Sequence, residues 1–300
     1  MTSDLKENIQ YLKSVEERLA RAAVLSPSVE AERLIRHFGG MDRIEFFTGE
    51  KTLPPGTKRS VEKALRARLT GEPLSYLLRE ADFYGHRFYV TKDTLIPRPE
   101  TEILVEEALR ILNERFDPRQ KHSGMTATPP EILDIGTGCG CVAVSLTLAR
   151  LDCRMTALDV SAKALQTARK NVDLYGLGNR IGLVRSDLFG AFEEERKGTW
   201  DMIVSNPPYV PEEDFPGLSK EVLSEPRLAL DGGPKGLRVL ERILDQAPAY
   251  LKEKGWLLLE IGKGQDEPLG EKISRMGIYK NLSFVKDHAG IQRVLIAQHG

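Results

Sequence analysis

The chain has 300 residues, of which 41% are hydrophobic and 29% charged, and its net charge at pH 7 is −1. This length predicts about two domains with ample core, and the balanced charge argues against a protein that tracks a nucleic-acid backbone, which would be basic. Three cysteines without C-x-x-C spacing and five scattered histidines predict small buried thiols and no metal site, and the lack of a signal core or of ~18 consecutive apolar residues predicts a cytoplasmic protein without a membrane segment.

The N-terminal part of the chain has a helical pattern. Apolar residues recur at spacings of three and four, beginning with Ile9, Leu12 and Val15. We therefore expect a helical bundle over residues 1–80. The next residues alternate aromatic and polar side chains around Gly85, which predicts a short β-hairpin with its turn near Gly85 and His86. We expect this hairpin to act as a linker between two domains, over residues 81–97.

Residues 98–300 have the pattern of an α/β domain. An amphipathic helix is expected over residues 100–116, followed by a surface loop over residues 117–130. Apolar, strand-like runs then alternate with helix-like stretches, which predicts a parallel sheet with right-handed crossovers. The strand-like runs are residues 131–135, 154–158, 181–184, 200–204, 251–261 and 291–297.

The first of these runs leads into a G-x-G-x-G turn, Gly136 to Gly140, and then into a helix-like stretch. Glycine lets the backbone pass close to a ligand, and a helix start offers free N–H groups. The spacing departs from the G-x-G-x-x-G pattern of dinucleotide sites, and by itself it also fits a plain tight turn.

Acidic residues accompany the first three strand-like runs, and they predict a nucleoside pocket. Asp134 lies in the first run, Asp159 ends the second and Asp187 follows the third. Asp159 is placed to bind the two hydroxyls of a ribose. Asp187 can accept a hydrogen bond from an adenine amino group, and Leu188 can lie against the ring. For Asp159 taken alone, a solvated loop carboxylate is an equally good interpretation.

The run Asn206-Pro207-Pro208-Tyr209 follows the fourth strand and is suited to holding a planar amino group. Two prolines end the strand and keep neighbouring groups in place. The Asn206 side-chain oxygen and the Pro207 carbonyl can each accept one N–H, and Tyr209 can stack behind the plane. We therefore expect Asn206, Pro207 and Tyr209 to be catalytic and all four residues to bind substrate. The alternative is a simple proline turn.

The order of these motifs resembles the Rossmann-like methyltransferases that use S-adenosylmethionine, and Asn-Pro-Pro-Tyr resembles their amino-methylating branch. Residues 71–78, 82–85, 95–102 and 225–233 are similar to segments of the peptide chain release factor glutamine methyltransferases. Two positions depart from that pattern. Arg79 stands where the family often has glycine, and Cys139 stands where serine or threonine is common.

The resemblance implies a seven-stranded methyltransferase sheet with an antiparallel last strand, and S-adenosylmethionine as cofactor. It implies methylation of the glutamine side-chain nitrogen in the Gly-Gly-Gln motif of class 1 release factors, by a monomer that contacts neither membrane nor nucleic acid. We expect residues 1–80 to bind the substrate protein. The alternatives are another protein glutamine, DNA adenine, or a binding module without turnover. The expected cofactor-binding residues are Asp134, Ile135, Gly136, Thr137, Gly138, Cys139, Asp159, Asp187, Leu188 and Asn206.

Overall fold

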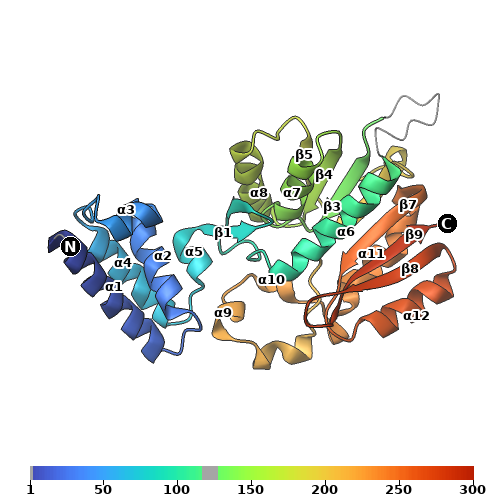
Figure 1. Cartoon of the computed structure of the whole chain (residues 1–300). Coiled ribbons are helices and arrows are strands. Elements are labelled where there is room, and N and C mark those ends of the chain that lie inside the picture. Colours follow the sequence, from blue (N-terminus) through green and yellow to red (C-terminus); the bar gives the residue numbers. More distant parts are fainter. Residues whose placement is uncertain (1–2, 117–127) are drawn as a thin grey trace. The chain divides into compact units, whose positions relative to one another are not determined.

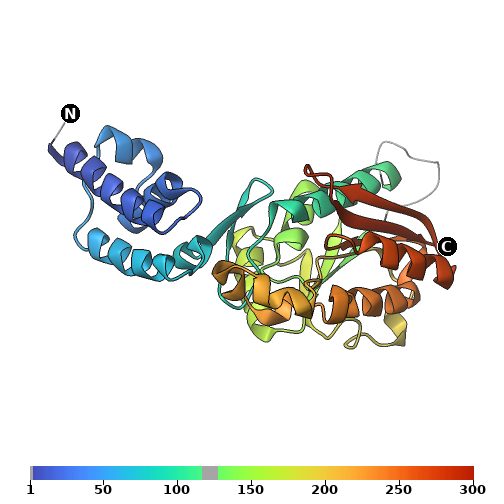
Figure 2. The same cartoon turned by 90° about the horizontal axis from the view of Figure 1, so that it is seen from below.

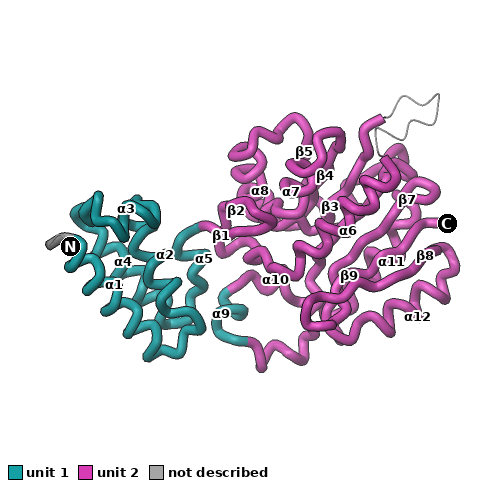
Figure 3. Tube along the Cα trace, viewed as in Figure 1, with its two compact units in different colours: residues 1–79, 219–224 teal, residues 80–218, 225–300 magenta. Residues whose placement is uncertain are grey.

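A computed structural model describes residues 3–116 and 128–300 (Figure 1). The chain divides into two compact units (Figure 3). Unit 1 comprises residues 1–79 and 219–224, and unit 2 comprises residues 80–218 and 225–300. Most of the loop expected over residues 117–130 lies outside the described residues. Within the described ranges, no helix combines the length and the apolar character that a membrane crossing requires.

Unit 1 is helical, as the spacing of its apolar residues predicts. Val15 and Leu19 on the first helix and Val61 and Leu65 on the fourth are fully buried, and Phe46 on the third belongs to the same core. A capping box at Asp42 begins the third helix, since its carboxylate accepts from the Glu45 N–H and the Glu45 carboxylate accepts from the Asp42 N–H. The helices are α1 (Ser3–Arg21), α2 (Pro27–Gly39), α3 (Arg43–Thr48), α4 (Thr57–Leu69) and α5 (Leu74–Leu78).

A short helix from much later in the chain, α9 (Lys220–Leu223), completes unit 1. Arg68 on α4 is only 5% exposed, and its guanidinium donates to the carboxylates of Glu30 on α2 and Glu221 on α9. This charge-assisted network fastens α9 to the bundle.

The expected hairpin is formed by β1 (Glu80–Phe83) and β2 (His86–Tyr89), and it belongs to unit 2. Phe83 pairs with His86, so the two turn residues are Tyr84 and Gly85, with φ of +49° and +73°. The turn lies one residue earlier than expected, because a two-residue hairpin loop of this type needs positive φ at both positions. The buried Asn171 side chain exchanges two hydrogen bonds with the Tyr89 backbone and so attaches the hairpin to the rest of unit 2.

Unit 2 contains a seven-stranded sheet with strand order β5-β4-β3-β6-β7-β9-β8. The first five strands of this sheet in chain order, β3 to β7, pair in parallel, and β9 runs antiparallel between β7 and β8. This confirms the predicted fold class, including the antiparallel strand near the end of the chain. The strands are β3 (Glu131–Ile135), β4 (Arg154–Asp159), β5 (Ile181–Arg185), β6 (Trp200–Ser205), β7 (Leu251–Glu260), β8 (Tyr279–Lys286) and β9 (Gln292–His299).

Helices cover both faces of this sheet, as Figures 1 and 2 show. One face carries α6 (Pro99–Arg115), α7 (Cys141–Ala149) and α8 (Ala162–Leu174), and the other carries α11 (Arg238–Tyr250) and α12 (Asp266–Met276). Residues 141–147 of α7 are all buried, as expected for a helix enclosed by the sheet and neighbouring helices. The remaining short elements are η1 (Glu194–Arg196), η2 (Glu212–Gly217), α10 (Arg227–Leu230) and η3 (Pro234–Gly236).

The strand order reverses between β3 and β6. From β3 the chain proceeds to β4 and β5 on one side, and it then returns to place β6 and β7 on the other side. Ile135 at the end of β3 is level with Ser205 at the end of β6. Such a reversal opens a crevice at the carboxyl ends of parallel strands, which is where open α/β sheets bind ligands.

Candidate active site

A pocket of about 680 Å³ lies at this reversal, entirely within unit 2. Its volume is within the usual range for small-molecule and cofactor sites. The structure brings to it every residue that the sequence predicts for cofactor binding, together with Pro207 and Pro208.

The glycine turn forms one wall of the pocket. Gly136, Gly138 and Gly140 have φ of +73°, +57° and +84°, a region that other residues rarely adopt. A Cβ built on Gly136 would lie 3.9 Å from the backbone oxygen of Asn206. A longer side chain at this position would therefore fill the space between the ends of β3 and β6. The pattern predicted from the sequence thus has a structural reason at each glycine.

Asp134 stabilises the glycine turn through a hydrogen bond. It is fully buried on β3, and its carboxylate accepts a 2.6 Å hydrogen bond from the Thr137 hydroxyl. Burial raises the pKa of Asp134 to about 7, while the bond from Thr137 opposes the rise and the charge of Asp159 adds to it. Asp134 lines the pocket and also holds the glycine turn in shape.

Asp159, the last residue of β4, is hydrogen-bonded to the turn that follows β3. One carboxylate oxygen accepts from the Gly138 N–H at 3.0 Å, and the other accepts from the Ser161 N–H at 2.8 Å. Burial raises the pKa of Asp159, and these backbone donors oppose the rise. Each carboxylate oxygen can accept a second hydrogen bond. Asp159 therefore lines the pocket with acceptor capacity to spare, in a position fixed by the backbone.

Asp187 and Leu188 form another part of the pocket wall, after β5. Leu188 is buried with φ of +48°, and its carbonyl accepts from the Ser186 hydroxyl, which holds this bend. The Asp187 side chain is 61% exposed and forms a 2.9 Å ion pair with Arg242 on α11. Asp187 thus lies at the open side of the pocket, and the sequence pattern did not indicate its partner.

Asn206 lies at the end of β6, opposite the glycine turn. Its side-chain Nδ2 donates to the Thr101 hydroxyl at 2.9 Å. Thr101 is in the first turn of α6 and lines the same pocket. Thr101 holds the Nδ2 end of the amide, and Oδ1 is the side-chain acceptor that Asn206 can offer a ligand.

Tyr209 differs from the other residues of its run. Its side chain is not among those that line the pocket beside Asn206. It lies by a second hollow, and its hydroxyl donates to Glu260 at 3.0 Å. Burial and the neighbouring Glu260 carboxylate raise the pKa of Tyr209 well above its usual value. The Tyr209 side chain is directed to Glu260 and not into the pocket, because a buried hydroxyl requires a hydrogen-bond partner.

Two chain segments contribute pocket residues that the sequence reasoning did not assign to the site. Most residues of the segments 93–97 and 226–231 line the cavity. They are held together by Glu225, a buried carboxylate that accepts from the Ile96 N–H and pairs with Arg98. The family-like sequence of residues 95–102 and 225–233 is the signal that could have located both segments.

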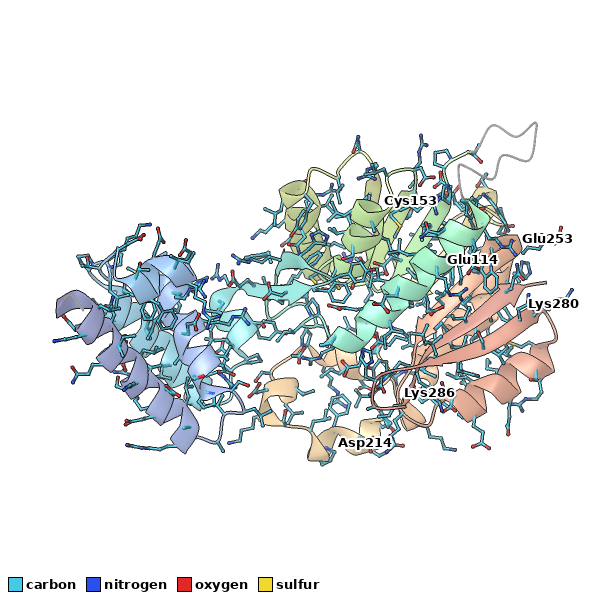
Figure 4. The ribbon with its side chains drawn as sticks, viewed as in Figure 1. Glu114, Cys153, Asp214, Glu253, Lys280 and Lys286 are labelled. Atoms are coloured by element: carbon cyan, nitrogen blue, oxygen red, sulfur yellow. The ribbon has the colours of Figure 1, made fainter. Side chains whose placement is uncertain are left out.

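All three cysteines are buried, as predicted. Cys139 lies in the glycine turn and Cys141 begins α7, and both line the pocket. Cys153, labelled in Figure 4, immediately precedes β4 and does not line the pocket.

Family models match the chain in two places. The methyltransferase small domain matches residues 110–233, and the PrmC N-terminal domain matches residues 10–78. Among solved structures, the human methyltransferase 10 domain containing protein has a TM-score of 0.51 at 19% identity, covering 78% of this chain and 96% of its own. The N-terminal domain of human METTL16 in complex with SAH has a TM-score of 0.50 at 20% identity, covering 79% and 83%. These likenesses concern the fold alone.

Curated relatives are much closer. A release factor glutamine methyltransferase of Chlorobaculum tepidum is 39% identical over 257 residues, which cover 84% of each chain. Proteins of the same name from Nitratidesulfovibrio vulgaris and Moorella thermoacetica are both 36% identical, over 96% of this chain and 93% and 97% of theirs. Matches of this identity and coverage identify the family, and the chain belongs to the release factor glutamine methyltransferases.

Proposed function

We propose that this protein transfers a methyl group from S-adenosylmethionine to the glutamine side-chain nitrogen in the Gly-Gly-Gln motif of class 1 peptide chain release factors. The observation that carries the proposal is the position of Asn206. It lies at the strand-order reversal, facing the glycine turn, with Nδ2 engaged by Thr101. An oriented amide acceptor beside a nucleoside-sized pocket is what transfer to an amino group requires.

The residues of the pocket fit the cofactor. Asp159 offers carboxylate oxygens for the ribose hydroxyls, while Asp187 and Leu188 lie where an adenine would be bound. The positive φ of Gly136 and Gly138 lets the backbone approach a ligand without a Cβ between them. When bound, S-adenosylmethionine supplies an activated methyl group on a sulfonium. We assign the cofactor site to Asp134, Ile135, Gly136, Thr137, Gly138, Cys139, Asp159, Asp187, Leu188 and Asn206.

The substrate nitrogen is a poor nucleophile because its lone pair is shared with the carbonyl. Asn206 Oδ1 and the Pro207 carbonyl each accept one amide N–H of the glutamine. These hydrogen bonds push electron density onto nitrogen, and they strengthen as it becomes pyramidal and positively charged. Holding the two reactants in line supplies several kcal/mol, up to roughly 7–11. The proton can leave after methyl transfer, so a dedicated general base is not needed.

The helical residues 1–80 bind the release factor outside its Gly-Gly-Gln loop, and the hairpin region 81–97 connects them to the methyltransferase domain, residues 98–300. An amino-group pocket cannot by itself select one protein, whereas unit 1 has its own core and exposes apolar side chains such as Ile44 and Phe47 on α3. The protein acts as a monomer in the cytoplasm, without membrane or direct nucleic-acid contacts.

The test is to incubate the protein with an unmethylated class 1 release factor, isotope-labelled S-adenosylmethionine and adenine-containing DNA. Label is expected in the release factor. It should be absent from a factor whose Gly-Gly-Gln glutamine is replaced by glutamate, which lacks the nitrogen. Transfer to DNA, or undiminished label in the glutamate variant of the factor, would contradict the proposal.

A further inference from the structure

We infer that Thr101 and Glu260 are positioning residues that fix the direction in which the Asn206 side-chain amide faces. This inference rests on the proposed function, because it concerns how Asn206 is prepared for the substrate amide. Thr101 and Glu260 come from α6 and β7, and the fold brings both to the end of β6, where Asn206 lies.

Polar side chains contact one another across these elements. Asn206 Nδ2 donates to Thr101 Oγ1 at 2.9 Å. The Thr101 hydroxyl also lies beside the Glu260 carboxylate and lowers its pKa. Oε1 of this carboxylate accepts from the Tyr209 hydroxyl at 3.0 Å, and Oε2 is buried without a hydrogen-bond partner among the described residues. Ser205 and Leu259 pair in the sheet, so Asn206, which follows β6, and Glu260, the last residue of β7, lie at the same level of adjacent strands.

The charged Glu260 carboxylate determines which group donates and which accepts in each of these contacts. A carboxylate can only accept hydrogen bonds, so the Thr101 hydroxyl proton is the group that meets the otherwise unpartnered Oε2 of Glu260. The Thr101 oxygen must then accept from its other neighbour, and only the Nδ2 end of Asn206 can donate. Oδ1 is therefore turned toward the pocket. The reversed amide would present N–H groups to the N–H groups of the substrate, and no hydrogen bond would form.

The burial of Glu260 argues that this carboxylate is more than a packing residue. It is 0% exposed, and a buried carboxylate is costly compared with an apolar side chain of similar size. Burial raises the pKa of Glu260 to about 7, while Thr101, Tyr209 and Arg293 lower it and Glu100 raises it further. At lower pH the protonated group can itself donate to Thr101, which releases the constraint on Asn206.

Thr101 provides the first test. Thr101→Val removes the hydroxyl at nearly constant volume, and kcat for release factor methylation should fall about 10- to 100-fold, as for one lost hydrogen bond in the transition state. Thr101→Ser restores the hydroxyl and should recover kcat to near the parent value. The matched control is Thr147→Val, which removes the hydroxyl of another fully buried helical threonine that does not line the pocket. Calorimetric affinity for S-adenosylmethionine should be unchanged in all three.

Glu260 provides the second test through the pH profile. With cofactor and release factor saturating, kcat of the parent should rise as the pH passes upward through about 7, the pKa of the buried Glu260 carboxyl. Glu260→Gln should be slower and should lose this rise, because a neutral amide both donates and accepts. The pKa of Asp134 is also about 7, so the inference depends on the difference between parent and Glu260→Gln and not on the parent profile alone.

The inference is overturned if Thr101→Val keeps the parent kcat, if Thr101→Ser is as slow as Thr101→Val, or if Glu260→Gln retains the rise with pH. These outcomes leave the proposed function standing, since the parent protein still methylates the glutamine. Failure of the parent protein to label the release factor would instead overturn the proposed function itself.

Discussion

Asp159→Asn tests two roles of Asp159, which are to hold the backbone at the pocket and to accept hydrogen bonds from the ribose. Both carboxylate oxygens already accept backbone N–H groups, from Gly138 at 3.0 Å and Ser161 at 2.8 Å. Asparagine has one oxygen and one NH₂ group, so in either orientation an NH₂ group faces one of these donors. One ribose acceptor is lost as well. A hydrogen bond to a charged group contributes roughly 1.5–3 kcal/mol, so affinity for S-adenosylmethionine should fall about 10- to 100-fold.

The free energy of unfolding should change less than the affinity. Burial disfavours the charged form of Asp159, as its raised pKa indicates, so removing the charge offsets the lost hydrogen bond. Isothermal calorimetry with S-adenosylmethionine and thermal unfolding measure the two effects. Asp173→Asn is the control, since Asp173 is an exposed residue of α8 that does not line the pocket and the change in net charge is the same. Equal affinities of Asp159→Asn and the control would refute the reasoning.

Three further predictions concern other parts of the molecule. Ile44→Glu places a charge on an apolar position of unit 1 that is 68% exposed, and it should weaken binding to intact release factor in calorimetry. The control is Leu151→Glu, at a position that is 79% exposed, precedes β4 and lies away from the pocket edge of the sheet, and it should not weaken binding. Equal binding by both variants would make unit 1 a structural element only. Arg79 ends α5 with φ of +55°, so Arg79→Gly should raise the free energy of unfolding by about 1 kcal/mol, and a lower unfolding temperature would contradict this. Because the pKa of Glu260 is raised from 4.5 to about 7 in the folded protein, its contribution to stability is present at low pH and is lost as the pH rises through 7. The stability of Glu260→Gln relative to the parent should therefore increase by about 2 kcal/mol between pH 5 and pH 8, and a difference independent of pH would exclude the raised pKa.

The sequence predicted the pocket well because its main residues follow directly from local patterns. A strand that runs into glycines, and acids at the ends of the next strands, must meet at one edge of a parallel sheet, so Gly136, Asp159 and Asp187 needed only the strand assignments. The strand β8 was not among the predicted runs. Most of its side chains are partly or fully exposed at the edge of the sheet, so it lacks the apolar character of the inner strands.

The supporting contacts could not be predicted in the same way. Thr101 is 105 residues from Asn206 in the sequence, and Glu260 is 51 residues from Tyr209, so only the folded sheet brings these pairs together. The position of Tyr209 after two prolines was clear, but the direction of its ring depends on the buried partner that its hydroxyl finds. The attachment of α9 to unit 1 likewise depends on Arg68, a contact across 153 residues.

The central claim is that Asn206 holds the glutamine side-chain amide for methyl transfer. The most direct measurement is tandem mass spectrometry of a class 1 release factor after incubation with S-adenosylmethionine and either the parent protein or Asn206→Ala. We expect the parent to add one methyl group to the side-chain nitrogen of the Gly-Gly-Gln glutamine, and Asn206→Ala to do so with kcat lower by about 10²- to 10³-fold. Cofactor affinity should change much less. Methylation by Asn206→Ala at the parent rate, or a methyl group found elsewhere in the factor, would contradict the account.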